Sequence, residues 1–261
     1  MDLRVIGCHG GETPRHRTSA FLLDDRVAID AGSLTSGMDL EAQCKLEAVL
    51  VSHAHLDHIR DLATIADNRA QNGCKPLVVC GIKPSIELLK KHFFNGKLWP
   101  DFTTIPTASK PTIVYQVLKP EVPAKVAGLT VRAILVSHTI DCSAFIIEYD
   151  GKTASKRGAI AYSGDTGPTK RFWEVLNEVE GLRALLMEVS FPNAQQKLAT
   201  VSGHHTPQTL GPELAKYKNP KDLATLLYHM KPTFQGEVER ECAKLKGLNL
   251  TVLSLGDHFI L

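Results

Sequence analysis

Histidine and aspartate are concentrated in one short run of this 261-residue chain, His53-Ala54-His55-Leu56-Asp57-His58. The run follows Val49-Leu50-Val51-Ser52, which has the composition of a buried strand. Side chains two positions apart on an extended chain point the same way, so His53 and His55 are expected to converge. Asp57 and His58 fall where the strand gives way to a helix, and that turn is expected to aim both at a second point nearby. Imidazole and carboxylate groups bind zinc and related transition metals, so the run predicts a metal site.

Three later apolar runs each end in one further donor of the same kind. These donors are His138 after the run 135–137, Asp165 after the run 160–164 and His229 after the run 225–228. Functional groups of α/β folds gather at the carboxyl ends of strands. A single histidine at a strand end is more often structural, but three such donors beside the first run indicate one shared metal centre.

The donors are numerous enough for two metal ions. The first set holds three imidazoles, His53, His55 and His138; the second set holds one carboxylate and two imidazoles, Asp57, His58 and His229. Asp165 can bridge the two ions through its two oxygens. Each ion then keeps room for a shared water, as a catalytic site requires. Two ions about 3.5–4 Å apart with an activated hydroxide between them promote displacement at phosphorus, so the pattern predicts a dinuclear hydrolase.

Alternating strand-like and helix-like segments must position these donors. Runs rich in β-branched residues and bounded by Gly, Pro or Asp predict strands over 3–8, 19–23, 26–30, 46–52, 77–80, 112–118, 129–137, 144–149, 159–163, 184–188, 225–228 and 251–255. Apolar residues at helical spacing predict helices over 58–66, 84–93, 170–179, 206–216 and 235–246. Asp57 is expected to cap the first of these helices, and Asp24-Asp25 to form the tight turn of a hairpin.

This order of elements predicts a layered α/β fold with two sheets face to face and helices outside. A doubly wound parallel sheet is the alternative. The chain has no evident internal repeat, low-complexity tract or linker. The proline-rich stretch 99–123 is expected to be an ordered surface excursion rather than a boundary, so a single domain over residues 1–261 is predicted.

Composition excludes several other classes of protein. The 30 basic and 28 acidic residues leave a net charge of +2, which argues against a protein that wraps nucleic acid. No apolar run reaches the roughly 18 residues of a membrane span, and the first residues do not resemble a signal peptide. The six cysteines form no Cys-x-x-Cys pair and are expected to stay unpaired, which favours a reducing cytoplasm.

The run His53–His58, together with His138, Asp165 and His229, resembles the metallo-β-lactamase superfamily. Its phosphodiesterase branch is the most similar, and the stretch 52–59 matches the core of the class II cyclic-nucleotide phosphodiesterase signature. The segments 98–102, 188–193, 203–207 and 229–232 match that branch more loosely. Asp61 departs from the pattern, which has Gly or Ser there, but no ligand position is affected. The resemblance implies a four-layer αββα sandwich.

The resemblance also implies an activity: a dinuclear-metal phosphodiesterase that hydrolyses 3′,5′-cyclic nucleotides (cAMP or cGMP) to 5′-nucleotides. Zinc is the first choice for its two divalent metal ions, with manganese or iron as alternatives. The other interpretation is an endonuclease like ribonuclease Z, which processes tRNA 3′ ends, or another metal-dependent hydrolase of the superfamily. Ribonuclease Z enzymes usually carry a long Gly-rich basic arm that grips tRNA, and the sequence has no such insertion.

Further site roles follow from the same resemblance. His204 aligns with the acid histidine that protonates the leaving alkoxide, with Glu188 orienting it and His205 as the local competitor. Asp30 resembles the aspartate that braces a ligand histidine, although a plain turn residue is an equal alternative. The expected partner is a small nucleotide; neither a membrane nor a nucleic acid is expected, and a homodimer is left open. An aromatic side chain is expected to stack on the purine ring of the nucleotide, and the candidates are Trp99, Phe102 and Phe94. The equal alternative is that these side chains form a hydrophobic plug, which anchors the proline-rich excursion to the core.

Overall fold

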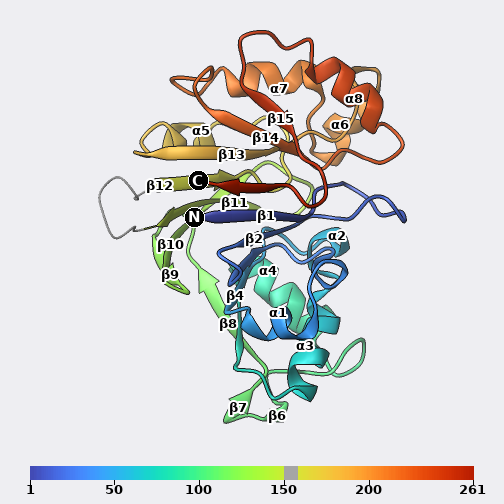
Figure 1. Cartoon of the computed structure of the whole chain (residues 1–261), viewed down its shortest axis with the longest axis vertical. Coiled ribbons are helices and arrows are strands. Elements are labelled where there is room, and N and C mark those ends of the chain that lie inside the picture. Colours follow the sequence, from blue (N-terminus) through green and yellow to red (C-terminus); the bar gives the residue numbers. More distant parts are fainter. Residues whose placement is uncertain (150–157) are drawn as a thin grey trace.

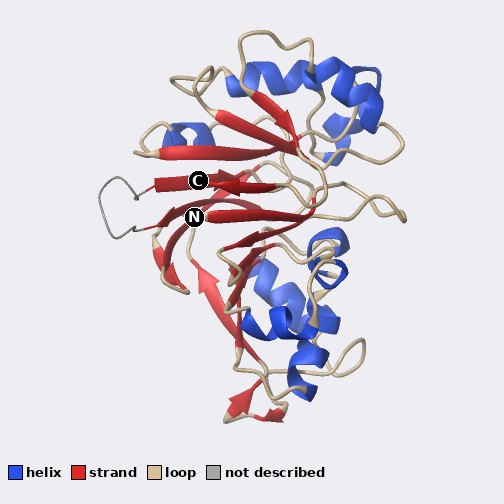
Figure 2. Cartoon of the chain, in the orientation of Figure 1, coloured by secondary structure: helices blue, strands red, loops and turns tan. Residues whose placement is uncertain are grey.

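Two seven-stranded β-sheets lie face to face, and helices cover the outer side of each (Figures 1 and 2). The computed structural model describes residues 1–149 and 158–261. The first sheet, in spatial order, consists of β16 (His258–Ile260), β1 (Asp2–Gly7), β2 (Ala20–Leu23), β3 (Val27–Ile29), β4 (Ala48–Leu50), β5 (Leu77–Ile82) and β8 (Ile113–Leu118). The second sheet consists of β15 (Leu250–Val252), β14 (Ala224–Tyr228), β13 (Leu182–Glu188), β12 (Gly158–Tyr162), β11 (Cys142–Tyr149), β10 (Leu129–Val136) and β9 (Ala124–Val126).

Both sheets mix parallel and antiparallel pairs. β1, β2 and β3 pair antiparallel, whereas β3, β4, β5 and β8 run parallel. In the second sheet β9 to β12 pair antiparallel and β12 to β15 run parallel. The αββα sandwich is therefore confirmed, and the doubly wound alternative is excluded. The short strands β6 (Pro106–Thr107) and β7 (Lys110–Pro111) form a separate hairpin within the proline-rich excursion.

Helices follow the two halves of the chain. The first sheet is covered by α1 (Leu40–Lys45), α2 (Leu56–Ile59), α3 (Leu62–Gln71) and α4 (Lys83–Leu88), and the second by α5 (Arg171–Leu176), α6 (Gln196–Ser202), α7 (Pro207–Leu214) and α8 (Gln235–Cys242) (Figure 1). Short helical turns span Leu34–Ser36, Leu89–Phe93 and Asn193–Gln195. The termini lie side by side, because β1 pairs antiparallel with β16.

Alternating apolar residues create three layers of core. Leu3 and Val5 of β1 face the space between the sheets, where they join Val131 and Ala133 of β10 in the central cluster. A second cluster lies between the first sheet and its helices, and a third between the second sheet and its helices. Burial of apolar surface on both faces of each sheet is the main stabilising contribution, at about 25 cal/mol per Å².

The expected strands and hairpin are present, and the differences lie at short elements. Asp24 and Asp25 have φ angles of 48° and 55° at the centre of the β2–β3 turn, which the hydrogen bond from Arg26 N to the Leu23 carbonyl oxygen closes at 3.0 Å. β9, β16, α1 and α6 were not predicted. The helix expected over 58–66 is two helices, α2 and α3. They separate at Asp61, whose Oδ2 accepts hydrogen bonds from the Thr35 amide and hydroxyl at 2.8 and 2.6 Å.

The prediction that all cysteines stay unpaired is wrong. Cys44 at the end of α1 and Cys74 after α3 form a disulfide with a Cα–Cα distance of 5.4 Å. The sequence separation of 30 hid the pair, because the two cysteines meet only where α1 packs on α3. The argument for a reducing compartment therefore loses this support. No helix in the described part of the chain has the length and apolar character to cross a membrane.

Arg69, at the centre of the α1–α3 contact, gives a test of stability. Its side chain is wholly buried and donates to the Gln43 and Lys75 carbonyl oxygens, and burial lowers its pKa to about 10. We expect Arg69→Leu to lower the free energy of unfolding by about 3 kcal/mol, because the buried Gln43 carbonyl and the partly buried Lys75 carbonyl lose their partners. Urea denaturation measures this, with the exposed Lys244→Met as control. A loss no larger than that of the control would contradict the assignment.

Candidate metal centre

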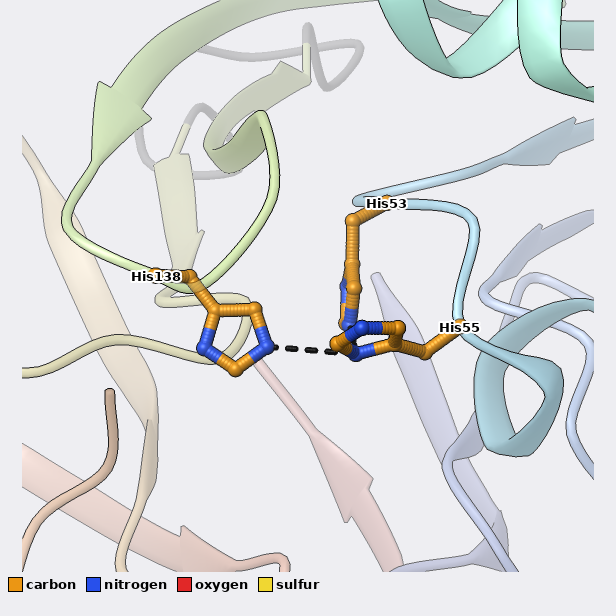
Figure 3. A group of neighbouring side chains, drawn as sticks. All are labelled: His53, His55 and His138. Carbon is orange, nitrogen blue, oxygen red and sulfur yellow. Dashed lines mark hydrogen bonds between the residues drawn. The ribbon is translucent and has the colours of Figure 1, made fainter. Parts of the chain in front are cut away.

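The first donors lie in the loop that joins β4 to α2. The His53 Nε2 and His55 Nδ1 atoms are 2.9 Å apart, so the two rings converge through different nitrogens (Figure 3). The convergence is as expected, but its cause differs. β4 ends at Leu50, so the loop conformation, and not strand alternation, aims the two rings at each other. Asp57 lies within α2 and makes no capping bond, which corrects its expected role as a helix cap.

His138 reaches the same point from the second sheet. It follows β10, and its Nε2 lies 3.2 Å from His55 Nδ1 (Figure 3). The opposite nitrogen, Nδ1, donates a hydrogen bond to the Gly203 carbonyl oxygen at 3.0 Å. That bond leaves the Nε2 lone pair directed at His53 and His55. One ligand atom from each of the three imidazoles lies within 4.8 Å of the other two.

A second group of donors forms beside the first. His58 Nε2 lies 3.2 Å from His229 Nε2, which in turn lies 3.4 Å from Asp57 Oδ2. The ligand atoms of these three residues also lie within 4.8 Å of one another. His58 comes from α2 and His229 follows β14, so this group too joins the two sheets.

Asp165 lies between the two groups. Its Oδ2 is 3.7 Å from His53 Nε2, 3.3 Å from His58 Nε2 and 3.2 Å from His229 Nε2. Its Oδ1 is buried and has no hydrogen-bond partner among the described residues. A buried carboxylate oxygen without a partner is costly, so this atom favours an additional cation at the site.

The protonation states of most of these donors also suit metal ions. Burial lowers the pKa values of four imidazoles, those of His53, His55, His138 and His229, and so favours their neutral, ligating form. Burial alone would raise the pKa of Asp165, but the neighbouring histidines lower it and keep the carboxylate ionised. The pKa of His58 is raised against burial by Asp165 and Asp30. This combination of neutral imidazoles and ionised carboxylates fits transition metal ions.

Asp30 supports the second group of donors from behind. Its Oδ2 accepts hydrogen bonds from His58 Nδ1, the Ser52 hydroxyl and the Tyr162 hydroxyl at 2.7, 2.8 and 2.7 Å, and its Oδ1 accepts from the Ser52 amide at 2.8 Å. Its φ of 57° is the left-handed conformation that Asp tolerates. Of the two roles considered for Asp30, the geometry fits the brace: the carboxylate orients His58 so that its Nε2 faces Asp165 and His229.

His204 lies beside both groups. Its ring is stacked on His229 with centroids 5.2 Å apart, and its centroid lies 5.0 Å from that of His138. Its Nδ1 lies 3.1 Å from Glu188 Oε1, the hydrogen bond expected from the sequence. The His205 ring is buried and bonds through Nδ1 to Thr209 Oγ1 at 3.0 Å, so it belongs to the start of α7 and not to the donor groups.

Two contributors, Ser190 and Tyr162, were not assigned from the sequence, and a third, Gly10, lies in a loop for which the sequence leaves open a close backbone approach to the metals or a plain turn. A Cβ on Gly10 would lie 2.4 Å from the His229 carbonyl oxygen and 2.9 Å from its Nδ1, so only glycine fits there. Ser190 Oγ lies 2.9 Å from His229 Nδ1, and Tyr162 binds Asp30 from the opposite sheet. Sequence signals did exist: Gly10 belongs to the glycine-rich loop after the first strand, Ser190 follows Glu188 by two positions, and Tyr162 ends a strand three positions before Asp165.

The three aromatic residues considered for purine stacking divide between the two expected roles. Phe94 and Phe102 are buried in the core beneath the first sheet, so they form the hydrophobic plug. Trp99 is 37% exposed, and its Nε1 donates to the Ala63 carbonyl oxygen at 3.1 Å. Of the three, only Trp99 keeps a surface accessible to a ligand.

Known proteins share this fold and sequence pattern. Residues 26–230 match the beta-lactamase superfamily domain. The chain is 28% identical over 285 residues to a probable 3′,5′-cyclic-nucleotide phosphodiesterase of Yersinia pestis, covering 90% of this chain and 79% of that protein. It is 25% identical over 283 residues to a ribonuclease Z of Bacillus licheniformis, covering 91% of this chain and 90% of that protein. The crystal structure of unliganded yeast PDE1 aligns over 98% of both chains with a TM-score of 0.78 and 20% identity.

The chain therefore belongs to the beta-lactamase superfamily and has the metallo-β-lactamase fold. It is a metal-dependent hydrolase, and its His and Asp side chains form groups able to bind metal ions. The resemblance to the phosphodiesterase branch is confirmed, since relatives named as cyclic-nucleotide phosphodiesterases and as ribonuclease Z both match over most of the chain.

The Asp30 brace gives a test of the metal centre. Asp30→Asn keeps the shape but replaces one acceptor oxygen with an NH₂ group, which cannot accept from the donors around it. We expect zinc affinity to fall about 10- to 100-fold, because His58 loses its orientation. Chelator competition measures the affinity, with the exposed Asp222→Asn as control. Equal affinities in Asp30→Asn and the wild type would refute the brace.

Proposed function

We propose that this chain is a dinuclear-metal phosphodiesterase that hydrolyses 3′,5′-cyclic nucleotides to 5′-nucleotides. The observation that carries the proposal is the position of Asp165, whose Oδ2 lies within 3.7 Å of imidazole nitrogens from both donor groups. The likeness to the Yersinia pestis and Aliivibrio fischeri cyclic-nucleotide phosphodiesterases, at 28% and 27% identity, supports the choice of substrate.

Seven side chains would hold the two ions. His53, His55 and His138 would bind the first, Asp57, His58 and His229 the second, and Asp165 would bind both. Zinc is the first choice, and manganese or iron would accept the same donors. When bound, the ions would supply a water nucleophile at neutral pH and neutralise charge on the phosphoryl oxygens.

His204 is proposed as the proton donor to the leaving group. Hydrolysis forms one P–O bond from water and breaks the bond from phosphorus to O3′, and the departing alkoxide needs a proton. Burial lowers the pKa of His204, but Glu188 more than offsets this and leaves the pKa raised, so the ring holds a proton to give. Glu188 is fully buried and fixes the ring through Nδ1, which leaves Nε2 to deliver the proton.

Asp57 is proposed to act on the nucleophile side. Its side chain is 29% exposed, whereas that of His229 beside it is 1% exposed, so Asp57 borders the open face of the site. Burial would raise the pKa of Asp57, but the neighbouring imidazoles of His229 and His58 lower it below its usual range. The carboxylate is therefore ionised and can accept a hydrogen bond from the attacking water.

A tRNA 3′-processing endonuclease is the second candidate, because a ribonuclease Z matches at 25% identity over 91% of the chain. The net charge of +2 and the absence of a long Gly-rich basic insertion from the sequence favour a small nucleotide over a tRNA. The two candidates share the metal centre and differ in the substrate.

A panel of substrates, assayed with the wild type and with Asp57→Ala, tests both the substrate class and the two-metal centre. The zinc-loaded wild type is expected to hydrolyse cyclic AMP or cyclic GMP, but not a precursor tRNA. Asp57→Ala is expected to lose at least about 100-fold in kcat on every phosphodiester, because one ligand of the second group is removed. Unchanged turnover by this variant would exclude the two-metal centre. If the wild type cleaves the precursor tRNA but neither cyclic nucleotide, the second candidate, a tRNA 3′-processing endonuclease, is the function.

The role of His204 is tested by the leaving group. His204→Ala should lower kcat for a cyclic nucleotide about 10²- to 10⁴-fold, because a ribose alkoxide leaves poorly without a proton. Turnover of bis(4-nitrophenyl) phosphate should fall far less, because nitrophenolate needs no proton to leave. His92→Ala, which removes an exposed histidine, is the control. Equal losses on both substrates would argue against proton donation by His204.

A further inference from the structure

Ser190 occupies the position where three groups of the site meet. It follows β13 by two residues and is fully buried. Its Oγ lies 3.0 Å from Glu188 Oε2, 2.9 Å from His229 Nδ1 and 3.2 Å from His204 Nδ1. One hydroxyl therefore touches the glutamate, a proposed metal ligand and the proposed proton donor.

The hydrogen-bonding capacity of a serine hydroxyl decides the direction of each contact. The group has one hydrogen to donate and two lone pairs to accept with. Glu188 Oε1 already accepts from Thr166 N, His205 N and His204 Nδ1, at 3.1, 3.3 and 3.1 Å. The Ser190 hydrogen goes to Oε2 of the ionised carboxylate, because charge-assisted hydrogen bonds are the stronger ones.

The two imidazoles must then donate to Ser190 Oγ, since its only hydrogen is already used. His229 therefore carries its proton on Nδ1, and its Nε2 presents a lone pair towards Asp57 and Asp165, 3.4 and 3.2 Å away. Nε2 is the atom that the metal proposal requires to be unprotonated. His204 likewise holds its Nδ1 proton between Glu188 and Ser190.

We infer that Ser190 is a positioning residue that sets the tautomer of His229 and the ring orientation of His204 through one hydroxyl. The inference rests on the proposed function of the same site. It assigns Ser190 no contact with substrate. Its hydroxyl links the second group of donors to the proton donor, so loss of the hydroxyl should weaken metal binding and proton delivery together.

The matched pair Ser190→Thr and Ser190→Val tests the hydroxyl itself. Both variants add the same bulk, and only Thr keeps the hydroxyl. We expect Ser190→Thr to bind zinc within about threefold of the wild type in chelator competition, and Ser190→Val to bind about 10- to 100-fold more weakly. Ser190→Ala repeats the loss without added bulk, and Ser85→Ala, which removes another buried serine hydroxyl, is the control. Equal zinc affinity in the Thr and Val variants would overturn the inference.

Two further readouts separate positioning from general packing. At saturating zinc, Ser190→Ala should lower kcat more for a cyclic nucleotide than for bis(4-nitrophenyl) phosphate, because His204 is misoriented. Nitrogen NMR of the ¹⁵N-histidine-labelled, zinc-loaded protein should show His229 protonated on Nδ1. The same tautomer is expected in the metal-free wild type, and an Nε2–H tautomer of His229 there would refute the assignment. Zinc affinity and NMR need no substrate, so they decide the role of Ser190 even if the protein hydrolyses no cyclic nucleotide.

Discussion

The carboxylate of Asp165 is the constraint around which the two halves of the molecule are arranged. It comes from the second sheet, yet its Oδ2 lies 3.3 Å from His58 Nε2, which belongs to the first half. Removing such a charge from water is expensive unless opposite charge and hydrogen bonds compensate it. The loops after β4, β12 and β14 must therefore be held close enough for imidazoles to surround the carboxylate, and the face-to-face packing of the sheets holds them there.

The support behind the donors is polar, and it also crosses between the sheets. The Tyr162 hydroxyl from the second sheet donates to Asp30 of the first, and Asp30 in turn orients His58. Gly10 lets the loop after β1 press against His229. A buried polar network whose hydrogen bonds are satisfied makes its surroundings rigid, so these contacts hold the donors in one arrangement before any ligand binds. Such preorganisation is what a metal centre needs for a defined geometry.

The donors could be predicted from sequence because each stands at the end of an apolar run, and strand ends in such folds meet at one edge. The conformation of the chain between the donors was harder to predict from the sequence. The β4–α2 loop turns Asp57 towards His229, where the local pattern indicated a cap. The Cys44–Cys74 disulfide, β9 and β16 depend on tertiary neighbours that no local pattern contains. The residue types of Ser190 and Tyr162 indicate no role by themselves, because His229, His204 and Asp30, which they contact, lie far from them in sequence.

Burial separates the donors into a wall and an open face. His53, His58, Asp165 and His229 are almost completely buried, whereas His55, Asp57 and His138 are half-buried. In the proposed reaction a phosphodiester can therefore approach only over the half-buried donors. His204 lies next to the half-buried His138 and is itself buried, with its Nδ1 held by Glu188. The fold thus buries the donors that must keep their charge and geometry, and leaves three of the proposed ligands half-buried at the face that a substrate would approach.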